Sequence, residues 1–353
     1  MTTIGIIPGD GIGPEITEAA IQVLRAAAPG LTYEYLPVGH VAAAGSGDPL
    51  PDQVMDRLRE LGVVLKAPLE APKGTGRIVK LRPDGHRVYP SINNAVRREL
   101  ELYANVRPVH AVPGVGRPGA ELDLMLVREV SEGIYSGIEH RIGDVAQAIK
   151  IATRPAWERI ARFSFELARE RGYDRVLLGH KANVLNLTDG LELEVVRTIA
   201  ADYPDVELQD MMVDALGQAI VRGDVPRSVV LLDNQYGDIL SDVAAAVIGS
   251  VGLGPGANYG ADVAVFEACH GAAPDIAGTG KANPVGLILS GAMLLRHLGD
   301  HRAAEAVEAA VRLVLGERRA LTPDLGGSAT TGDVTAQVVA ALDEVDEAVA
   351  VRA

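Results

Sequence analysis

The stretch Asp233-Asn234-Gln235-Tyr236-Gly237-Asp238-Ile239-Leu240-Ser241-Asp242 directly follows the apolar run at 228–232. The apolar run predicts a buried strand, and the ten residues predict a helix that continues from a turn at Tyr236-Gly237. On such a helix Asp238 and Asp242 lie one turn apart on one face, so their carboxylates can converge. Converging carboxylates suit Mg²⁺ or Mn²⁺, but a solvated helix face also carries such charges. The ten residues alone leave both alternatives open.

Length and composition limit the class of protein. A chain of 353 residues corresponds to about two domains, and 48% hydrophobic with 23% charged residues describes a globular chain that can bury substantial cores. The formal net charge of −14 argues against a nucleic-acid-binding protein. A chain this acidic must gather its arginines locally if it binds acidic substrates.

The cysteine count and the apolar runs bear on location. The single cysteine, Cys269, excludes an internal disulfide framework and fits a reducing compartment. Residues 1–5 lack the charged and apolar regions of a signal peptide, and no apolar run is long enough to span a bilayer. We therefore expect a cytoplasmic protein that binds neither membranes nor nucleic acids.

The chain opens with a predicted strand at 3–7, the glycine-rich turn Pro8-Gly9-Asp10-Gly11-Ile12-Gly13-Pro14, and a predicted helix. This order is typical of a dinucleotide-binding Rossmann fold, but the glycine spacing is G-x-G-x-G and no acidic residue ends a second strand at the expected distance. Pro14 at the start of a helix after a tight turn explains the glycines without a ligand. The sequence therefore argues against a Rossmann fold.

The next segment carries candidate anion-binding residues. Patterning predicts a helix at 52–61, a strand at 63–66, a long loop at 68–90 and a helix at 91–100 that is capped by Ser91. Strands follow at 103–109 and 124–129. Three arginines lie on these elements, and together they could bind a di- or tricarboxylate through bidentate contacts. Each arginine alone would more often form a surface salt bridge. They are Arg97, Arg107 and Arg128.

Several blocks along nearly the whole chain resemble one family. They are Ile7-Pro8-Gly9-Asp10-Gly11-Ile12-Gly13, Leu102-Tyr103-Ala104-Asn105-Val106-Arg107-Pro108, Tyr135-Ser136-Gly137-Ile138-Glu139-His140, His180-Lys181-Ala182-Asn183, Gly237-Asp238-Ile239-Leu240-Ser241-Asp242 and His270-Gly271-Ala272-Ala273-Pro274-Asp275-Ile276-Ala277-Gly278. With these blocks the chain resembles the decarboxylating β-hydroxyacid dehydrogenases that act on isocitrate, homoisocitrate, 3-isopropylmalate and tartrate. The order of so many blocks makes coincidence negligible.

The resemblance assigns roles position by position. It implies that Arg97, Arg107 and Arg128 grip the carboxylates of the malate core and that Tyr135 and Lys181 form the catalytic pair. It also implies that Asp214, Asp238 and Asp242 bind the metal. Lys181, Asn183 and Asp214 would reach the site of a partner subunit, so the minimal active unit would be a homodimer. For residues 233–242, the resemblance thus favours a metal site over a solvated helix face.

The residue types suit the reaction that the resemblance implies. Mg²⁺ or Mn²⁺ would lower the pKa of a chelated substrate hydroxyl, and Lys181 would complete its deprotonation as hydride passes to NAD. Three arginines and a metal would depress the pKa of such a lysine. Tyr135 would reprotonate carbon after CO₂ leaves.

The fold class also follows from the resemblance. It implies an α/β, two-domain fold of the isocitrate/isopropylmalate dehydrogenase type that is not a Rossmann fold. Residues 1–100 and 253–353 would form a large cofactor-binding domain, and residues 101–252 a small domain with the dimer interface. The Gly- and Pro-rich block at 252–257 would be the linker that returns to the large domain.

In this family Asp-Ile after Ala-Pro accompanies NAD, whereas Lys-Tyr accompanies NADP. The chain has Asp275-Ile276, and a carboxylate there would accept hydrogen bonds from the ribose and repel a 2′-phosphate, so NAD is the predicted cofactor. An Asp before such a segment can also be a simple turn cap. The remaining expected cofactor contacts are Glu70, His270, Gly271, Ala273, Pro274 and Asn283.

The substrate is the least determined feature. Ser91 and Asn93 match the isocitrate type, in which these residues meet the γ-carboxylate. Two departures keep homoisocitrate, another acidic malate such as a phosphonate, and 3-isopropylmalate as alternatives. Glu70-Ala71-Pro72 stands where isocitrate members usually carry Thr-Thr-Pro, and the basic loop at 73–90 is longer than usual. This loop could contact a larger substituent or be a solvated insert.

A regulatory subunit without catalytic activity would keep the fold but lose members of the catalytic set. All eight arginine, tyrosine, lysine and aspartate residues of that set are present, so we expect an enzyme.

Overall fold

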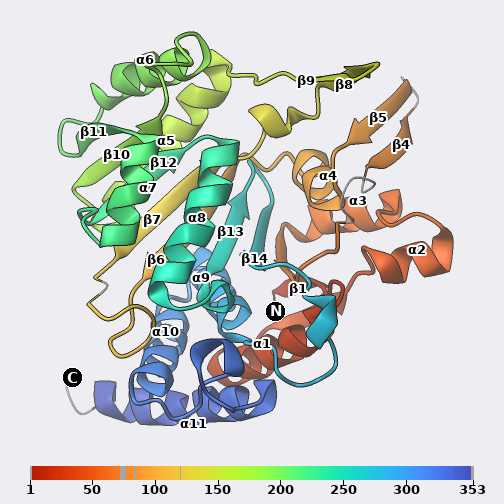
Figure 1. Ribbon diagram of the computed structural model, residues 1–353. Helices are drawn as coiled ribbons and strands as arrows, with labels where there is room; N and C mark the ends of the chain where they lie inside the picture. The colour runs from red at the N-terminus through yellow and green to blue at the C-terminus, as the bar shows by residue number, and fades with distance from the viewer. Residues whose placement is uncertain (1, 72–76, 83–84, 120, 351–353) are drawn as a thin grey trace.

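The structure, a computed structural model, describes residues 2–71, 77–82, 85–119 and 121–350. Ten of its described strands form one sheet in the order β11-β10-β12-β7-β6-β13-β14-β3-β1-β2 (Figure 1). The strands are β1 (Thr3–Ile7), β2 (Thr32–Tyr35), β3 (Val63–Lys66), β6 (Ala104–His110), β7 (Asp123–Glu129), β10 (Arg175–His180), β11 (Glu207–Met212), β12 (Ser228–Leu232), β13 (Pro255–Tyr259) and β14 (Ala264–Ala268). The sheet has two parallel groups, one at each end. They are joined in the middle by β6 and β13, which pair antiparallel with their neighbours.

Helices from both ends of the chain pack together. Helix α1 (Gly13–Ala27) lies against α9 (Val285–His297), α10 (His301–Gly316) and α11 (Thr331–Ala350), so the N-terminal and C-terminal segments are side by side (Figure 1). The other half of the sheet carries α5 (Arg154–Arg171), α6 (Thr188–Ala200), α7 (Val213–Arg222) and α8 (Asn234–Ile248). The short helices are α2 (His40–Ser46), α3 (Asp52–Leu61) and α4 (Ile92–Glu99). The predicted α/β class is confirmed.

The glycine-rich turn before α1 is a packing feature. Gly11 has φ +58°, and a Cβ at this position would lie 2.0 Å from the carbonyl oxygen of Ala272. The next residue, Ile12, donates its N–H to that same carbonyl at 2.8 Å. Because only glycine permits this approach, the turn is held against the loop that carries His270 and Gly271. The turn thereby positions a site residue without itself being a dinucleotide fingerprint.

The segment at 252–257, predicted as a linker, is not an irregular loop. Residues Val251–Leu253 form a 3-10 turn, and Pro255 begins β13, which lies between β6 and β14 in the middle of the sheet. Proline is tolerated as the first residue of a strand. A Cβ at Gly256 would lie 2.9 Å from the carbonyl oxygen of Glu267, so glycine permits close strand packing there. The sheet therefore continues across the expected domain boundary, and the two-domain division stays a prediction.

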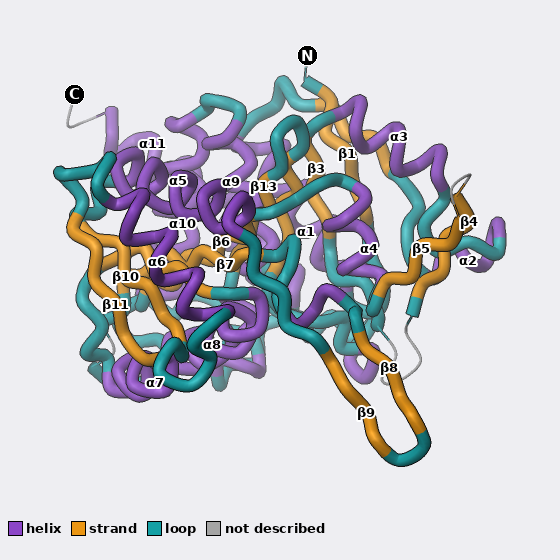
Figure 2. The backbone as a smooth tube through the Cα atoms, turned by 90° about the horizontal axis from the view of Figure 1, so that it is seen from above, coloured by secondary structure: helices purple, strands orange, loops and turns teal. Residues whose placement is uncertain are grey.

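The segment expected as a long loop is in part a hairpin. Its described residues form β4 (Ile78–Arg82) and β5 (Gly85–Tyr89), whereas Lys73 and the Arg82 side chain lie outside the described part. A second hairpin, β8 (Glu139–Ile142) with β9 (Val145–Ala148), projects from the body of the molecule (Figure 2). An ion pair between Arg77 and Glu139 joins the two hairpins. Within the described residues, no helix has the length and apolar character needed to cross a membrane.

Candidate active site

The three predicted arginines meet in one cavity of about 380 Å³. Arg107 on β6 and Arg128 on β7 are 6% and 2% exposed, and Arg97 comes from the last turn of α4. Nine of the predicted site residues line this cavity. They are Ser91, Asn93, Arg97, Arg107, Arg128, Tyr135, Asp238, His270 and Gly271.

Short polar contacts orient the arginines. Arg97 donates to Asn258 at 3.2 Å and to Glu267 at 3.0 Å. Arg107 donates to Asn105 at 2.7 Å and to Ser241 at 2.6 Å. Burial, and then the positive charges of Arg107 and Arg97, lower the pKa of Arg128. Positive charge held this close in a buried place favours an anionic ligand.

Helix α8 supplies the predicted metal-binding pair. It begins earlier than the expected turn, because Asp233 caps it by accepting the N–H of Tyr236 at 2.6 Å. Asp238 lies 2.5 Å from Arg128 and 3.6 Å from Arg107, and Asp242 lies 3.9 Å from Arg107. The two carboxylates thus flank the arginines from one helix face, as the sequence predicts.

The donor set of one chain fits a divalent cation only in part. Carboxylate oxygens are the ligands that Mg²⁺ and Mn²⁺ prefer, and the side chains of Asp238 and Asp242 are 42% and 63% exposed. Within the described residues, however, no three His, Cys, Asp or Glu side chains gather as a metal site. A cation held here would need further ligands from a substrate, water or another subunit.

Tyr135 lies on a 3-10 turn (Ile134–Ser136) at the edge of the cavity. Its hydroxyl donates to Asp238 at 3.5 Å, and the guanidinium of Arg128 lies 5.7 Å from its ring. Burial, and then the charge of Asp238, raise the pKa of Tyr135. The phenol therefore stays protonated at neutral pH and can donate a proton.

Ser91 and Asn93 lie at the start of α4. Ser91 Oγ accepts the N–H of Asn94 at 3.2 Å, which leaves its own proton free to be donated. Asn93 donates its amide to the carbonyl of Leu69 at 3.3 Å. Its Oδ1 is buried without a hydrogen-bond partner within the described residues. The pair therefore offers the cavity one hydroxyl donor and one unused acceptor.

Three predicted residues lie away from this cavity. Lys181 Nζ pairs with Asp214 at 2.6 Å, so these two remain together but do not line the cavity of their own chain. Asn183 is exposed. Their placement is compatible with a role in a partner's site, which stays a prediction.

A second cavity of about 470 Å³ adjoins the first and shares His270 and Gly271 with it. Ala273, Ile276 and Asn283, three further predicted cofactor residues, also line it. His270 Nδ1 lies 3.0 Å from the carbonyl of Gly271, so Nδ1 carries the proton there and Nε2 is an acceptor. Nε2 is buried without a partner among the described residues, and burial lowers the pKa of His270. A neutral acceptor of this kind fits a ligand with hydroxyl or amide donors.

The other predicted cofactor residues lie beside the second cavity or apart from it. Pro274 and Asp275 belong to an exposed 3-10 turn (Pro274–Ile276), of which only Ile276 reaches the lining. Glu70 lines neither cavity, and its carboxylate lies 3.5 Å from His40. Their contacts to a cofactor stay predictions.

Sequence reasoning missed several lining residues. Lys66 and Glu267 form a buried ion pair in the floor of the first cavity, and Asn258 donates to Glu267 at 2.8 Å. Burial opposes ionisation of Glu267, but Lys66 and Arg97 hold its pKa below the usual range. Asn234, to which the sequence analysis gave no role, accepts from Arg128 at 2.7 Å. The adjacency of Asn234 to a buried strand was the one available signal.

Comparisons with known proteins agree with this geometry. The chain is 38% identical over 346 residues to isocitrate dehydrogenase [NAD] subunit alpha of Pongo abelii, covering 98% of this chain and 91% of that one. It is 41% identical to 3-isopropylmalate dehydrogenase of Archaeoglobus fulgidus, covering 97% and 100%. A crystal structure of isocitrate dehydrogenase from Methylococcus capsulatus superposes with a TM-score of 0.90 at 42% identity, covering 97% and 99%.

The family's sequence model gives the same answer over almost the whole chain. The isocitrate/isopropylmalate dehydrogenase model matches residues 3–340. This match, the relatives and the paired cavities together show that the chain belongs to the isocitrate/isopropylmalate dehydrogenase family.

Proposed function

We propose that the chain oxidises isocitrate with NAD and releases CO₂, which yields 2-oxoglutarate and NADH. The family makes it an NAD-dependent decarboxylating dehydrogenase, and the choice of isocitrate is the proposal. The observation that carries this choice is the Ser91 hydroxyl, whose proton is free to be donated into the cavity where Arg97, Arg107 and Arg128 cluster in a chain of net charge −14. Such a cluster matches a substrate with several carboxylates.

The Ser91 hydroxyl favours an acidic substituent on the malate carbon. The Ser91 hydroxyl proton is free to be donated to a carboxylate, because its oxygen already accepts the cap hydrogen bond. An isopropyl group would leave this donor unpaired, at a cost of roughly 1–3 kcal/mol. Asn93 uses its own donor on Leu69, so Ser91 would carry more of the contact than the sequence suggested.

The described part of the β4–β5 hairpin offers little support for a larger substrate. Lys80 is buried between Asp48 and Asp52, at 2.7 and 2.8 Å, and Arg77 pairs with Glu139. No described residue of either strand lines the first cavity. Homoisocitrate therefore remains the second candidate on the basis of the loop's length and basic composition alone.

In the proposed reaction, different residues would have different roles. A bound Mg²⁺ or Mn²⁺ would stabilise negative charge on the substrate oxygens, with Asp238 and Asp242 of one subunit and Asp214 of its partner as the proposed ligands. Arg97, Arg107 and Arg128 would orient the carboxylates. Lys181 would take the hydroxyl proton in the partner's site, where the nearby positive charges would favour its neutral form. Tyr135, which stays protonated, would give a proton to carbon after CO₂ leaves.

A homodimer is the proposed active unit. On the projecting β8–β9 hairpin, the apolar residues Ile142 and Val145 are 72% and 59% exposed. Exposed apolar side chains on an isolated two-stranded hairpin suit burial against another chain. We place the interface in residues 101–252 and the cofactor in the domain formed by residues 1–100 and 253–353. A cytoplasmic location, inferred from the single cysteine, is part of the same proposal.

Absorbance of NADH provides the test. Purified protein with isocitrate, NAD and MnCl₂ should form NADH, and excess chelator should abolish the reaction. Asp238→Asn should raise the Mn²⁺ concentration needed for half-maximal rate by at least about tenfold, because it removes a charged ligand. Glu194→Gln, a change on an exposed face of α6, is the matched control. Full activity in chelator would refute the metal assignment.

A further inference from the structure

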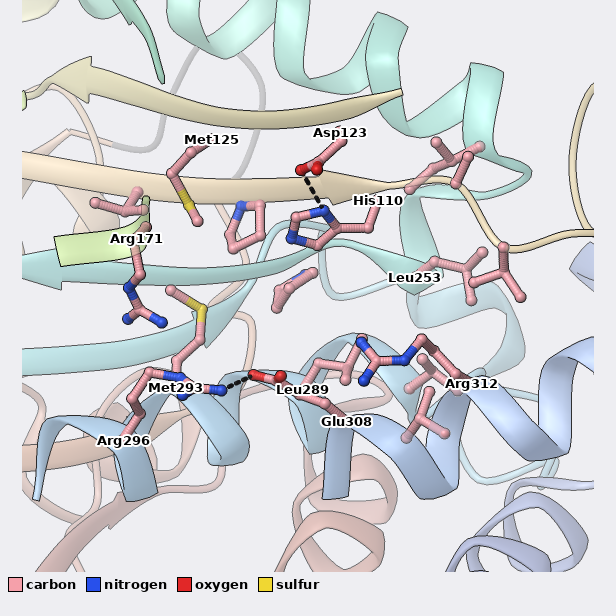
Figure 3. A pocket seen from close by; sticks show the side chains of 18 of the residues that line it. His110, Asp123, Met125, Arg171, Leu253, Leu289, Met293, Arg296, Glu308 and Arg312 are labelled. Carbon is pink, nitrogen blue, oxygen red and sulfur yellow. Dashed lines mark hydrogen bonds and ion pairs between the residues drawn. The ribbon is translucent and has the colours of Figure 1, made fainter. Parts of the chain in front are cut away.

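A third cavity, of about 370 Å³, lies on the opposite face of the central strands from the arginine cluster. Strands β6, β7 and β13 form one wall, and helices α9 and α10 form the other (Figure 3). Side chains alternate along β6, so Val106 and Pro108 line this cavity whereas Arg107, between them, lines the substrate cavity. The two cavities are therefore back to back across one strand. Its size falls within the usual range of small-molecule sites, roughly 300–1,000 Å³.

The wall of this cavity is mostly apolar. Met125 from β7 and Met293 from α9 face each other across it, and Leu253 and Leu289 continue the apolar surface (Figure 3). These side chains suit an aliphatic or aromatic group, since removing apolar surface from water is favourable. A bare inorganic anion would leave them without a partner.

The polar part of the lining carries an excess of positive charge. The described lining residues include four arginines but only two carboxylates, although the chain as a whole is acidic. Arg227 is engaged by Asp123 at 2.9 Å, and the other carboxylate, Glu308, pairs with Arg296 at 2.9 Å. Arg296 also lies 3.7 Å from Glu305. Among the four described arginines of the lining, Arg171 and Arg312 are therefore the ones without a carboxylate partner from the lining itself.

Two of the four arginines, whether or not they are ion-paired, have an unused hydrogen-bond donor. The Nε atoms of Arg171 and Arg296 are buried without a hydrogen-bond partner among the described residues. Arg171 Nε lies 3.3 Å from Glu170 but without hydrogen-bond geometry. Both guanidinium groups turn toward the space between the sheet and the helices (Figure 3). The neighbouring Tyr259 has a pKa that burial raises to about 12, so it remains a neutral hydroxyl.

We propose that this cavity binds an apolar monocarboxylate, with its tail against Met125, Leu289 and Met293 and its carboxylate on Arg171 and Arg296. Buried guanidinium donors without partners are costly, and a carboxylate has two oxygens that can accept charge-assisted hydrogen bonds from such donors. Such a ligand would contact the strand that carries Arg107. The proposal goes beyond the proposed dehydrogenase reaction and does not depend on which malate is oxidised.

Methionine-methyl NMR with octanoate as the probe tests the site. The chain has six methionines, of which Met125 and Met293 line this cavity and none lines the substrate cavity. Octanoate should shift the Met125 and Met293 signals saturably and leave those of Met55, Met211 and Met212 in place. Octanol, which has the same chain without the charge, should bind at least about tenfold more weakly. Equal affinity of the two probes, or no shift at Met125 and Met293, would overturn the proposal.

Variants test the carboxylate contact and the apolar wall of the cavity separately. Arg171→Met should weaken octanoate binding about tenfold without changing octanol binding, and Leu289→Trp should reduce the binding of both by filling the apolar wall. Arg25→Met, which removes an exposed arginine outside the cavity, is the control and should bind octanoate as the native chain does. Unchanged octanoate affinity in folded Arg171→Met would refute the carboxylate contact. If Leu289→Trp does not fold, the comparison of octanoate with octanol on the native chain still decides the question.

Discussion

Asp238 has more than one partner in the cavity. Its carboxylate lies 2.5 Å from Arg128 and 3.6 Å from Arg107, and the Tyr135 hydroxyl donates to it at 3.5 Å. A tricarboxylate that occupied both arginines would compete with Asp238 for them and leave that carboxylate available to a cation. Substrate and metal should therefore bind synergistically.

Calorimetry checks this synergy. Mn²⁺ should bind the protein with at least about tenfold higher affinity in the presence of isocitrate, after correction for the isocitrate–Mn²⁺ complex in solution, and linkage requires the reverse effect to be equal. Asp238→Asn should lose most of the effect. Identical Mn²⁺ affinity with and without isocitrate would show that Asp238 is not shared in this way.

Asp275 and Ile276 provide a second prediction at this scale. Replacing them with Lys and Tyr should move kcat/KM from NAD toward NADP by at least about tenfold, because a cation would replace a carboxylate that repels the 2′-phosphate. Steady-state rates with each cofactor measure the change. A native enzyme that preferred NADP would overturn the assignment. Because Asp275 is exposed, its replacement should leave the fold intact.

At the scale of elements, a buried charge cluster joins three segments. Lys150 lies 2.8 Å from Asp233, which caps α8, and 3.1 Å from Glu192 on α6. It also pairs with Asp189, whose other oxygen accepts the N–H of Lys181 at 2.8 Å. One lysine among three carboxylates leaves excess negative charge in a buried place. Burial raises the pKa of Glu192 to about 8. The positive charge of Lys150 opposes this shift, whereas the negative charges of Asp189 and Asp233 add to it.

This shift predicts a pH-dependent stability. The folded-state pKa lies above the ordinary value of 4.5, so the folded chain holds a proton that the unfolded chain loses. The stabilisation is complete below that ordinary value and disappears as pH rises toward the folded-state pKa. The free energy of unfolding should decrease between pH 5 and pH 8 in the native chain. The corresponding decrease in Glu192→Gln should be smaller by on the order of a few kcal/mol. Denaturant unfolding at several pH values measures this, with Glu194→Gln as the control. Parallel pH profiles for the native chain and Glu192→Gln would contradict the prediction.

The elements differ in how far sequence could predict them. The strand at 228–232 and the helix at 52–61 follow from apolar spacing, and both form as expected. Residues 255–257 were misassigned because Gly and Pro usually mark loops, whereas here the tertiary position between β6 and β14 decides the conformation. The arginine cluster could be predicted because family motifs fix it. Lys66 and Glu267 could not, because they come from β3 and β14, which are distant in sequence and adjacent only in the sheet.

At the scale of the whole molecule, the two residues of the proposed catalytic pair lie apart. Tyr135 lines the arginine cavity, whereas Lys181 pairs with Asp214 outside it. A complete site would then need Tyr135 from one subunit and Lys181 from another. Under this proposal, a homodimer would be required for activity rather than being a packing preference.

Complementation tests that requirement. Tyr135→Phe and Lys181→Met should each lose most activity as pure dimers. A heterodimer of the two has one native site, so mixed and reassembled subunits should recover about a quarter of native activity if assortment is random. Size-exclusion chromatography confirms that dimers form. No recovery from mixtures that contain heterodimers would place Tyr135 and Lys181 in the same subunit's site.

The proposed substrate is tested most directly by comparing kcat/KM for isocitrate, homoisocitrate and 3-isopropylmalate under identical conditions with NAD and Mn²⁺. With Ser91 free to donate and three arginines in the cavity, isocitrate should exceed 3-isopropylmalate by at least about 100-fold. Efficient turnover of 3-isopropylmalate, with isocitrate and homoisocitrate left unused, would contradict the account.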